Sequence, residues 1–183
     1  RWIIMNSTIQ SIQNAFMDLY HKHAYDKITV KDLCIHTPIA RTTFYTYYDN
    51  IDDVKNEIED LLIKGLLDVT EQVSLGDVSH MNFKVFLDAT QSYIEKHWDW
   101  FYSFMIQQIN ERFIDKWKEA IKYNFSRKYP DKTTIHNYDL ISEVLASATI
   151  GAYTYWMKYP DKVNTEDMKE IIIKAINALI EVI

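Results

Sequence analysis

The scarcity of glycine and proline is the feature that most constrains the fold of this chain. Its 183 residues include three glycines and three prolines, the residue types from which tight turns are usually built. A fold of many short strands needs frequent turns, whereas long helices need few. The sequence therefore predicts an all-α protein with short connections. A chain of this length forms one or two domains and buries a core without disulfides.

Apolar residues recur every three or four positions along most of the chain, which is the spacing of an amphipathic helix. In the first helix, Met5, Ile9, Ile12, Phe16 and Leu19 share one face. The pattern predicts about nine helices and no strand. The expected helices cover about 2–23, two short segments around 30–34 and 40–47, a long segment through 54–69, and then 83–96, 98–105, 109–125, 138–159 and 166–183.

Charge and composition limit where the protein acts. The net charge is −6, but residues 1–50 carry +1 and residues 51–183 carry −7, so a polyanion would be tolerated at the first end only. No apolar run of about 18 residues exists, so we expect no membrane span. The single cysteine, Cys34, cannot form an internal disulfide and is expected to be a buried thiol. These features predict a cytoplasmic protein.

The first fifty residues show the order helix, short helix, tight turn, short helix, which is a helix-turn-helix arrangement. Thr29 precedes Asp32 by three residues, a spacing that predicts a capping box at the start of the second helix. Asn50 and Asp53 repeat that spacing before the fourth helix. A short helix supported in this way fits the major groove of B-DNA.

Three segments of this region, "ITVKDLC" (28–34), "RTTFYTYYDN" (41–50) and "IDDV" (51–54), resemble the TetR/AcrR family of bacterial transcription regulators. The likeness covers about the first 55 residues and is strongest at the Thr-Phe-Tyr core and Tyr48. It implies a DNA-binding domain at 1–50 and a ligand-binding and dimerisation domain at 51–183.

The resemblance also assigns roles to individual residues. Phe44 and Tyr48 are expected inside the head, and Arg41 is expected to face the bases, where arginine reads guanine. Hydroxyl groups nearby suit phosphates. The candidate DNA contacts are Thr29, Lys31, Arg41, Thr42, Thr43, Tyr45, Thr46, Tyr47, Asn50 and Lys55.

The turn before the third helix departs from the family pattern. Pro38 stands where the family usually has glycine, and proline cannot adopt a positive φ. We therefore expect Thr37 as the N-cap of the third helix and Pro38 as its first residue. Ala40 replaces the usual serine cap and offers no capping oxygen.

The start of the fourth helix departs as well. Ile51 stands at the usual phosphate-contacting lysine, and Asn50 or Lys55 would have to substitute. Carboxylates surround it, at Asp49, Asp52 and Asp53. Carboxylates suit a helix N-terminus but repel phosphate, so we expect few phosphate contacts and a shallow salt dependence of DNA binding. A loss of DNA binding is the alternative.

The second domain is rich in aromatic residues, most of which are expected in the core. The family resemblance implies that some of them line an effector pocket between helices, and an aromatic pocket favours a flat or cationic apolar molecule. The candidates are Leu62, Leu66, Tyr93, Phe101, Met105, Phe113, Trp117 and Tyr153.

The last two helices predict a homodimer. "IIIKAINALIEVI" (171–183) is apolar nearly all round, so it must be covered on more than one side. The helix before it carries small residues that allow close approach, at Ala146, Ser147, Ala148, Gly151 and Ala152. A two-fold four-helix interface fits both features and implies a palindromic operator in double-stranded DNA. Burial within one subunit is the alternative.

Other classes of function lack support in the sequence. It has no phosphate-binding glycine loop, no H-E-x-x-H and no G-x-S-x-G motif, so we expect no enzyme and no cofactor. His21 and His23 are two apart on a helix and point in different directions, so we expect no metal site. The favoured hypothesis is a ligand-responsive repressor released by a small apolar or aromatic effector. The runner-up is a co-regulator or protein-binding module of the same fold without autonomous DNA binding.

Overall fold

The computed structural model describes residues 2–74, 82–131 and 136–181, which form nine α-helices and no strand, as predicted. The α-helices are α1 (Trp2–Lys22), α2 (Val30–His36), α3 (Arg41–Phe44), α4 (Ile51–Ser74), α5 (Phe83–Lys96), α6 (Trp98–Tyr102), α7 (Glu111–Lys128), α8 (Tyr138–Lys158) and α9 (Thr165–Glu181). A π-helical turn, Ser103–Gln107, extends α6. Single 3₁₀ turns lie at Tyr25–Lys27 and Pro160–Lys162.

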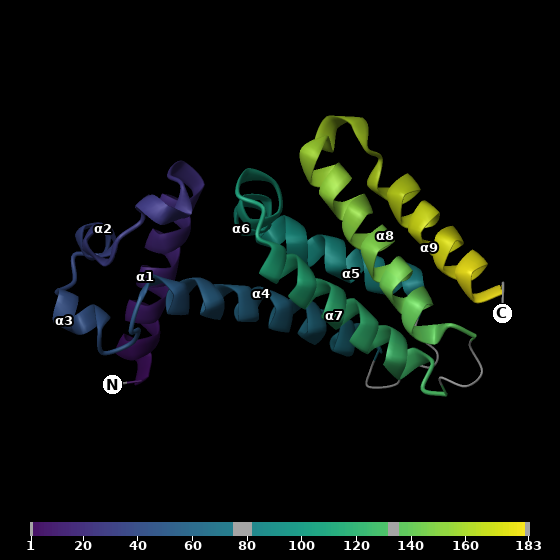
Figure 1. Cartoon of the computed structure of the whole chain (residues 1–183), viewed down its shortest axis with the longest axis horizontal. Coiled ribbons are helices and arrows are strands. Elements are labelled where there is room, and N and C mark those ends of the chain that lie inside the picture. The colour runs from purple at the N-terminus through teal and green to yellow at the C-terminus, as the bar shows by residue number, and fades with distance from the viewer. Residues whose placement is uncertain (1, 75–81, 132–135, 182–183) are drawn as a thin grey trace.

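The helices form a small head and a larger body (Figure 1). Helices α1, α2 and α3 pack together at one end, and α8 and α9 lie side by side at the other. Helix α4 joins the two parts, because it packs against α1 and also against α5 and α7. The domain boundary expected at residues 50 and 51 therefore falls at the first turn of the connecting helix.

The buried core is continuous from head to body. Phe16 and Phe44 centre the head, and both are fully buried. In the body, the rings of Phe101, Trp117 and Tyr153 follow one another at centroid distances of 5.4 and 5.5 Å. Edge-to-face and tilted pairs of this kind add to the stability gained from burial. Most of the aromatic residues of the body are buried in this core or pack against it, as expected.

Several boundaries and exposures differ from the predictions. Helix α7 begins at Glu111 because the side chain of Asn110 caps it, accepting a hydrogen bond from the N–H of Phe113 (3.2 Å). Ile109 therefore lies before the helix and is exposed. Cys34 is a free thiol and is half-buried, not buried, because the seven-residue α2 turns only Leu33 fully inward. Among the described residues, no helix is long and apolar enough to cross a membrane.

Candidate nucleic-acid interface

The capping box at the start of α2 forms as predicted. The N–H of Asp32 donates to the hydroxyl of Thr29 (3.2 Å), and the N–H of Thr29 donates to the Asp32 carboxylate (3.0 Å). The Thr29 hydroxyl also donates to that carboxylate (2.5 Å). These hydrogen bonds from Thr29 lower the pKa of Asp32. The box satisfies the free N–H groups of the first turn and fixes where α2 begins.

The turn between α2 and α3 corrects one prediction. Thr37 is the C-cap of α2, with both its N–H (2.9 Å) and its hydroxyl (2.8 Å) donating to the carbonyl of Leu33. It therefore ends one helix and does not begin the next. Pro38 lies exposed in the turn that follows, and α3 begins at Arg41 with Ala40 as its N-cap. A proline after a helix end is favourable because it cannot continue the helix.

Helix α3 is shorter than predicted, ending at Phe44 and continuing through residues 45–47 as turns. In these turns the hydrogen bonds span three residues and not four: the N–H of Thr46, for example, donates to the carbonyl of Thr43 (3.2 Å). Ala40 provides no side-chain cap hydrogen bond, and threonine and tyrosine lose rotamer freedom in a helix. Both effects favour a short helix.

The aromatic segment divides into an inner and an outer face. Phe44 and Tyr48 are buried, with ring centroids 5.8 Å apart. Tyr45 is 54% exposed, and its ring packs edge-on against Phe44 at 5.4 Å. Arg41, Thr42 and Thr46 are exposed beside it, while Thr43 and Tyr47 are half-buried. The structure therefore gathers most of the predicted contacts of α3 on one accessible surface.

A polar network that the sequence reasoning missed holds this segment in place. The hydroxyl of Tyr48 donates to the carboxylate of Glu57 on α4, and the amide of Gln13 on α1 donates to both, at 3.2 and 3.1 Å. Burial and the hydrogen bond to Glu57 raise the pKa of Tyr48. The available signal was Gln13, a polar residue beside the apolar stripe of α1 that is buried in the structure.

The remaining candidates lie in two settings. Thr29 and Lys31 are exposed at the start of α2. Asn50 is the cap of α4, its side chain accepting from the N–H of Asp53 (3.0 Å). Lys55 is turned toward the protein: its ammonium lies 4.6 Å from the centroid of the Tyr25 ring and 3.9 Å from Glu59. The structure does not bring Lys55 to the surface that carries Arg41.

The acidic residues around the start of α4 are largely engaged within the head. Asp53 accepts from the N–H of Asp49 (3.0 Å), and Asp52 accepts from the hydroxyl of Tyr25. Burial is the main cause that raises the pKa of Tyr25, and the hydrogen bond to Asp52 raises it further. Ile51 is half-buried and packs against the core. Ile51, Asp52 and Asp53, which depart from the pattern that the resemblance implies, therefore stabilise the head through contacts within it.

The candidate effector residues lie together in the body, but their side chains fill the space between its helices. All eight except Tyr93 are buried. Leu66, Trp117 and Tyr153 line a cavity of about 20 Å³, which Thr90 also lines. The Thr90 hydroxyl is buried without a hydrogen-bond partner among the described residues. A space of this size suits one water molecule.

Tyr93 fills a notch in α4. A Cβ added at Gly65 would lie 1.9 Å from the Tyr93 hydroxyl oxygen and 2.2 Å from the ring carbon that bears it. Glycine is therefore required here because the ring occupies the space of a side chain. Tyr93 also contacts His97, with ring centroids 4.6 Å apart, and burial lowers the pKa of His97.

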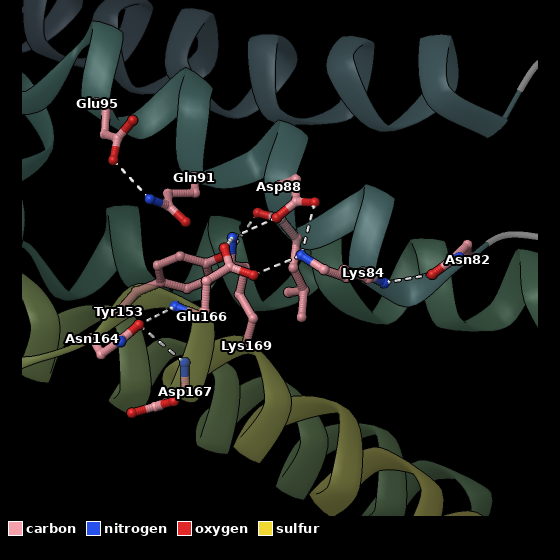
Figure 2. Close-up of polar contacts among 11 residues, drawn as sticks. Asn82, Lys84, Asp88, Gln91, Glu95, Tyr153, Asn164, Glu166, Asp167 and Lys169 are labelled. Atoms are coloured by element: carbon pink, nitrogen blue, oxygen red, sulfur yellow. Dashed lines mark hydrogen bonds and ion pairs between the residues drawn. The ribbon is translucent and has the colours of Figure 1, made fainter.

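A second polar cluster joins α5 to α9 (Figure 2). The ammonium of Lys169 is nearly buried and pairs with Asp88 and Glu166, and Lys84 pairs with the same two carboxylates at 3.4 and 2.7 Å. Lys169 and Lys84 lower the pKa of Glu166 from 4.5 to about 2. Removing one partner would leave the Lys169 charge partly buried without compensation, so the cluster fixes α9 on α5.

The outer face of α8 and α9 exposes several large apolar side chains. Leu140 and Tyr155 of α8 and Ile171 of α9 are 62%, 55% and 66% exposed. Among the small residues of α8, Ser147, Ala148 and Gly151 are exposed on this face, whereas Ala146 is buried inside the subunit and Ala152 is half-buried. Residues 182 and 183 of the predicted apolar helix lie outside the described residues.

Comparison with known proteins identifies the fold. No protein-family model and no curated sequence matches the chain. Among solved structures, a TetR transcriptional regulator from Streptococcus agalactiae matches over 96% of this chain and 99% of its own, with 18% identity and a TM-score of 0.73. A TetR-family regulator from Syntrophomonas wolfei matches over 95% of both chains, with 15% identity and a TM-score of 0.71.

A further solved structure is described as the dihydroxyacetone kinase operon activator DhaS. It matches over 96% of this chain and 97% of its own, with 19% identity and a TM-score of 0.62. These likenesses extend over the body as well as the head. The chain therefore has the fold of TetR-family transcriptional regulators.

Proposed function

We propose that this protein is a DNA-binding transcriptional regulator that acts as a homodimer on a palindromic operator. The observation that carries the proposal is the exposed surface of α3 and the turn after it, which carries Arg41, Thr42, Tyr45 and Thr46. Hydrogen bonds of Tyr48 to α1 and α4 hold this segment in place. Arginine and hydroxyl groups on a short helix suit the major groove and its phosphates.

Selection of bound sequences from random double-stranded DNA, followed by gel shifts across salt, tests this function. The expected product is a palindrome with half-sites about one helical turn apart. Arg41→Ala is expected to relax the preference at one base pair by ~1–3 kcal/mol, and Tyr45→Ala to weaken all sites alike. Lys64→Ala, on the body, is the control and is expected to change neither. Failure to select any sequence at low salt would refute the proposal.

The proposed dimer uses the apolar outer face of α8 and α9. Large exposed apolar side chains on adjacent helices mark an interaction surface, and a self-complementary patch gives a two-fold pair. Ile171→Glu places a charge in that face and is expected to give a monomer that binds DNA weakly. Ile109→Glu, at an equally exposed isoleucine in the body, is the control. Sedimentation measures both; a dimer that survives Ile171→Glu would exclude this interface.

The proposed effector is a small apolar or aromatic molecule that enters the body between α4, α5, α7 and α8. The space beside Leu66, Trp117 and Tyr153 holds about 20 Å³, so binding must separate side chains that now touch. An effector that favours such an opened state shifts the population away from the DNA-competent one. We therefore propose a repressor that its effector releases.

A thermal-shift screen of aromatic and apolar compounds tests the effector proposal, with release of operator DNA as the second reading. Thr90→Val removes the unpartnered hydroxyl of the cavity and is expected to weaken compounds that carry a polar group. A reporter gene under the selected operator distinguishes repression from activation. A screen in which no compound releases DNA would contradict effector control.

A co-regulator without autonomous DNA binding is the second candidate. The observation that favours it is the acidic start of α4, where Asp49, Asp52 and Asp53 flank a half-buried Ile51. Carboxylates near the phosphate backbone oppose binding. A homodimer that shifts no DNA alone, but does so after a related regulator is added, would support this candidate over the first.

A further inference from the structure

The π-helical turn that extends α6 brings the side chain of Gln108 into contact with the head. The π-helical turn Ser103–Gln107 closes with the N–H of Gln108 donating to the carbonyl of Ser103 (3.0 Å). The N–H of Asn110 then donates to the carbonyl of Phe104 (2.8 Å). Wide turns of this type often occur at functional sites. Here the turn packs against α1, the first helix of the head.

Gln108 uses its side-chain amide entirely on the head. Its Nε2 donates to the carbonyls of Tyr20 (2.5 Å) and His23 (2.8 Å), and its Oε1 accepts from the N–H of Tyr25 (2.8 Å). Its backbone carbonyl accepts from the hydroxyl of Tyr20 (3.2 Å). The last carbonyls of a helix lack partners within that helix. Gln108, a residue of the body, therefore caps the end of α1, although it lies more than eighty positions further along the chain.

Tyr25 connects this contact to α4. Its backbone N–H binds Gln108, its hydroxyl donates to Asp52, and its ring lies under the ammonium of Lys55 at 4.6 Å. Head, connecting helix and body thus meet at one residue. Helix α4 already packs against α1, and the Gln108 contact adds an attachment point away from the α4 axis, which further restricts rotation of the head.

We propose that Gln108 is a positioning residue that sets the orientation of the head on the body, and so the half-site separation that the dimer accepts. This inference rests on the proposed DNA-binding function. Gln108 does not lie on the α3 surface, so it acts on spacing and not on the choice of bases. The contacts of its side-chain amide are all to backbone atoms, which makes them independent of the side chains at Tyr20 and His23.

Two substitutions at Gln108 test the proposal. Gln108→Met keeps the length and removes the hydrogen bonds, while Gln108→Glu turns a carboxylate oxygen toward two carbonyls. Selection from a library of palindromes with varied spacers is expected to give one dominant spacing for the native protein. Both variants are expected to accept a broadened or shifted range of spacings with the same half-site sequence. Gln72→Met, at an exposed glutamine near the end of α4, is the control and is expected to keep the native spacing.

Hydrogen exchange provides a measurement that needs no DNA. The amide of Tyr25 is expected to exchange about tenfold faster in Gln108→Met, the factor that corresponds to one net hydrogen bond, while amides of α7 keep their rates. A change confined to this region separates a positioning role from general destabilisation. Native spacing preference in both variants would overturn the proposal. If the native protein selects no DNA, the proposed function fails, and unchanged exchange at Tyr25 would then overturn the role of Gln108 separately.

Discussion

Head and body treat their polar side chains differently. In the body, the ammonium groups of Lys84, Lys116 and Lys122 are each held by carboxylates of other helices or of the same helix. In the head, Lys31 and Arg41 are exposed, and within the described part of the chain neither is drawn into an ion pair or side-chain hydrogen bond. These three charges of the body are paired within the protein, whereas Lys31 and Arg41 stay accessible, as the proposed DNA contact requires.

The two parts also differ in how much core supports them. The head depends on a few side chains around Phe16, Leu33 and Phe44, all fully buried. The body has a connected run of rings and several interhelical ion pairs. Because fewer contacts hold the head, one truncation in its core removes a larger share of its stability.

Of the substitutions considered, Phe44→Ala is expected to have the largest effect, because it lowers the stability of the head relative to that of the body. Truncating a fully buried phenylalanine costs ~3–5 kcal/mol, which is enough to unfold the small head while the body stays helical. Circular dichroism is expected to show an early, small transition before the main one, and gel shifts to show no DNA binding.

Phe113→Ala is the matched control, since Phe113 is equally buried but lies in the body. It is expected to lower the main transition and to leave no separate early step. A single common transition in both variants would show that head and body unfold as one unit, and the contrast in their stability would then fail.

Gly65→Ala is expected to have the next largest effect. The new Cβ would collide with the Tyr93 ring, and overpacking of this kind costs ~1–3 kcal/mol, offset in part by the better helix propensity of alanine. Urea unfolding measures the change in the free energy of unfolding. Gly65→Ala combined with Tyr93→Leu removes the ring, so the double variant is expected to recover most of that loss. An equal loss in both would exclude the collision as its cause.

Gly151→Ala is expected to act in the opposite direction and more weakly. A Cβ at Gly151 meets nothing within 4 Å in the single chain, so the change should stabilise α8 by ~0.5–1 kcal/mol. If α8 and α9 form the dimer interface, the same methyl group lies in that interface and should weaken the dimer. Unfolding of the Ile171→Glu monomer and sedimentation of the dimer measure the two effects. A dimer that becomes tighter would argue against close approach at Gly151.

Local signals predicted much of the fold. The spacing of apolar residues placed α5 at its observed bounds, Phe83–Lys96, and the Thr29 and Asp32 pair gave the start of α2 correctly. The prediction for Thr37 was wrong because a threonine hydroxyl can end a helix by bonding a carbonyl as well as begin one. The inward placement of Phe44 and Tyr48, which the family resemblance implied, is confirmed.

Contacts between distant segments could not be predicted from such signals. Gln108 reads as an ordinary polar residue near the end of a helix, and only the fold brings its amide to the carbonyls of Tyr20 and His23. The need for glycine at position 65 also comes from another helix, because the Tyr93 ring occupies the space of a side chain there. The side-chain packing that leaves about 20 Å³ beside Trp117 is likewise a property of the assembled body.

Acid is expected to weaken the body through its interhelical carboxylates, with the smallest effect for any single residue. Lys122 and Lys118 lower the pKa of Glu143 from 4.5 to about 2. A lowered folded-state pKa stabilises the fold above pH 4.5, and this contribution disappears as the pH falls toward 2. The side chain of Glu143 is 43% exposed, so solvent screening keeps the contribution small. The Tm measured from pH 6 to pH 2 should therefore fall less steeply in Glu143→Gln and in Lys122→Met than in the native protein. If both variants keep the native slope, the ion pair between Glu143 of α8 and Lys122 of α7 adds nothing to the stability of the body. The internal pairing of charges would then be a difference in geometry between body and head, without a difference in stability.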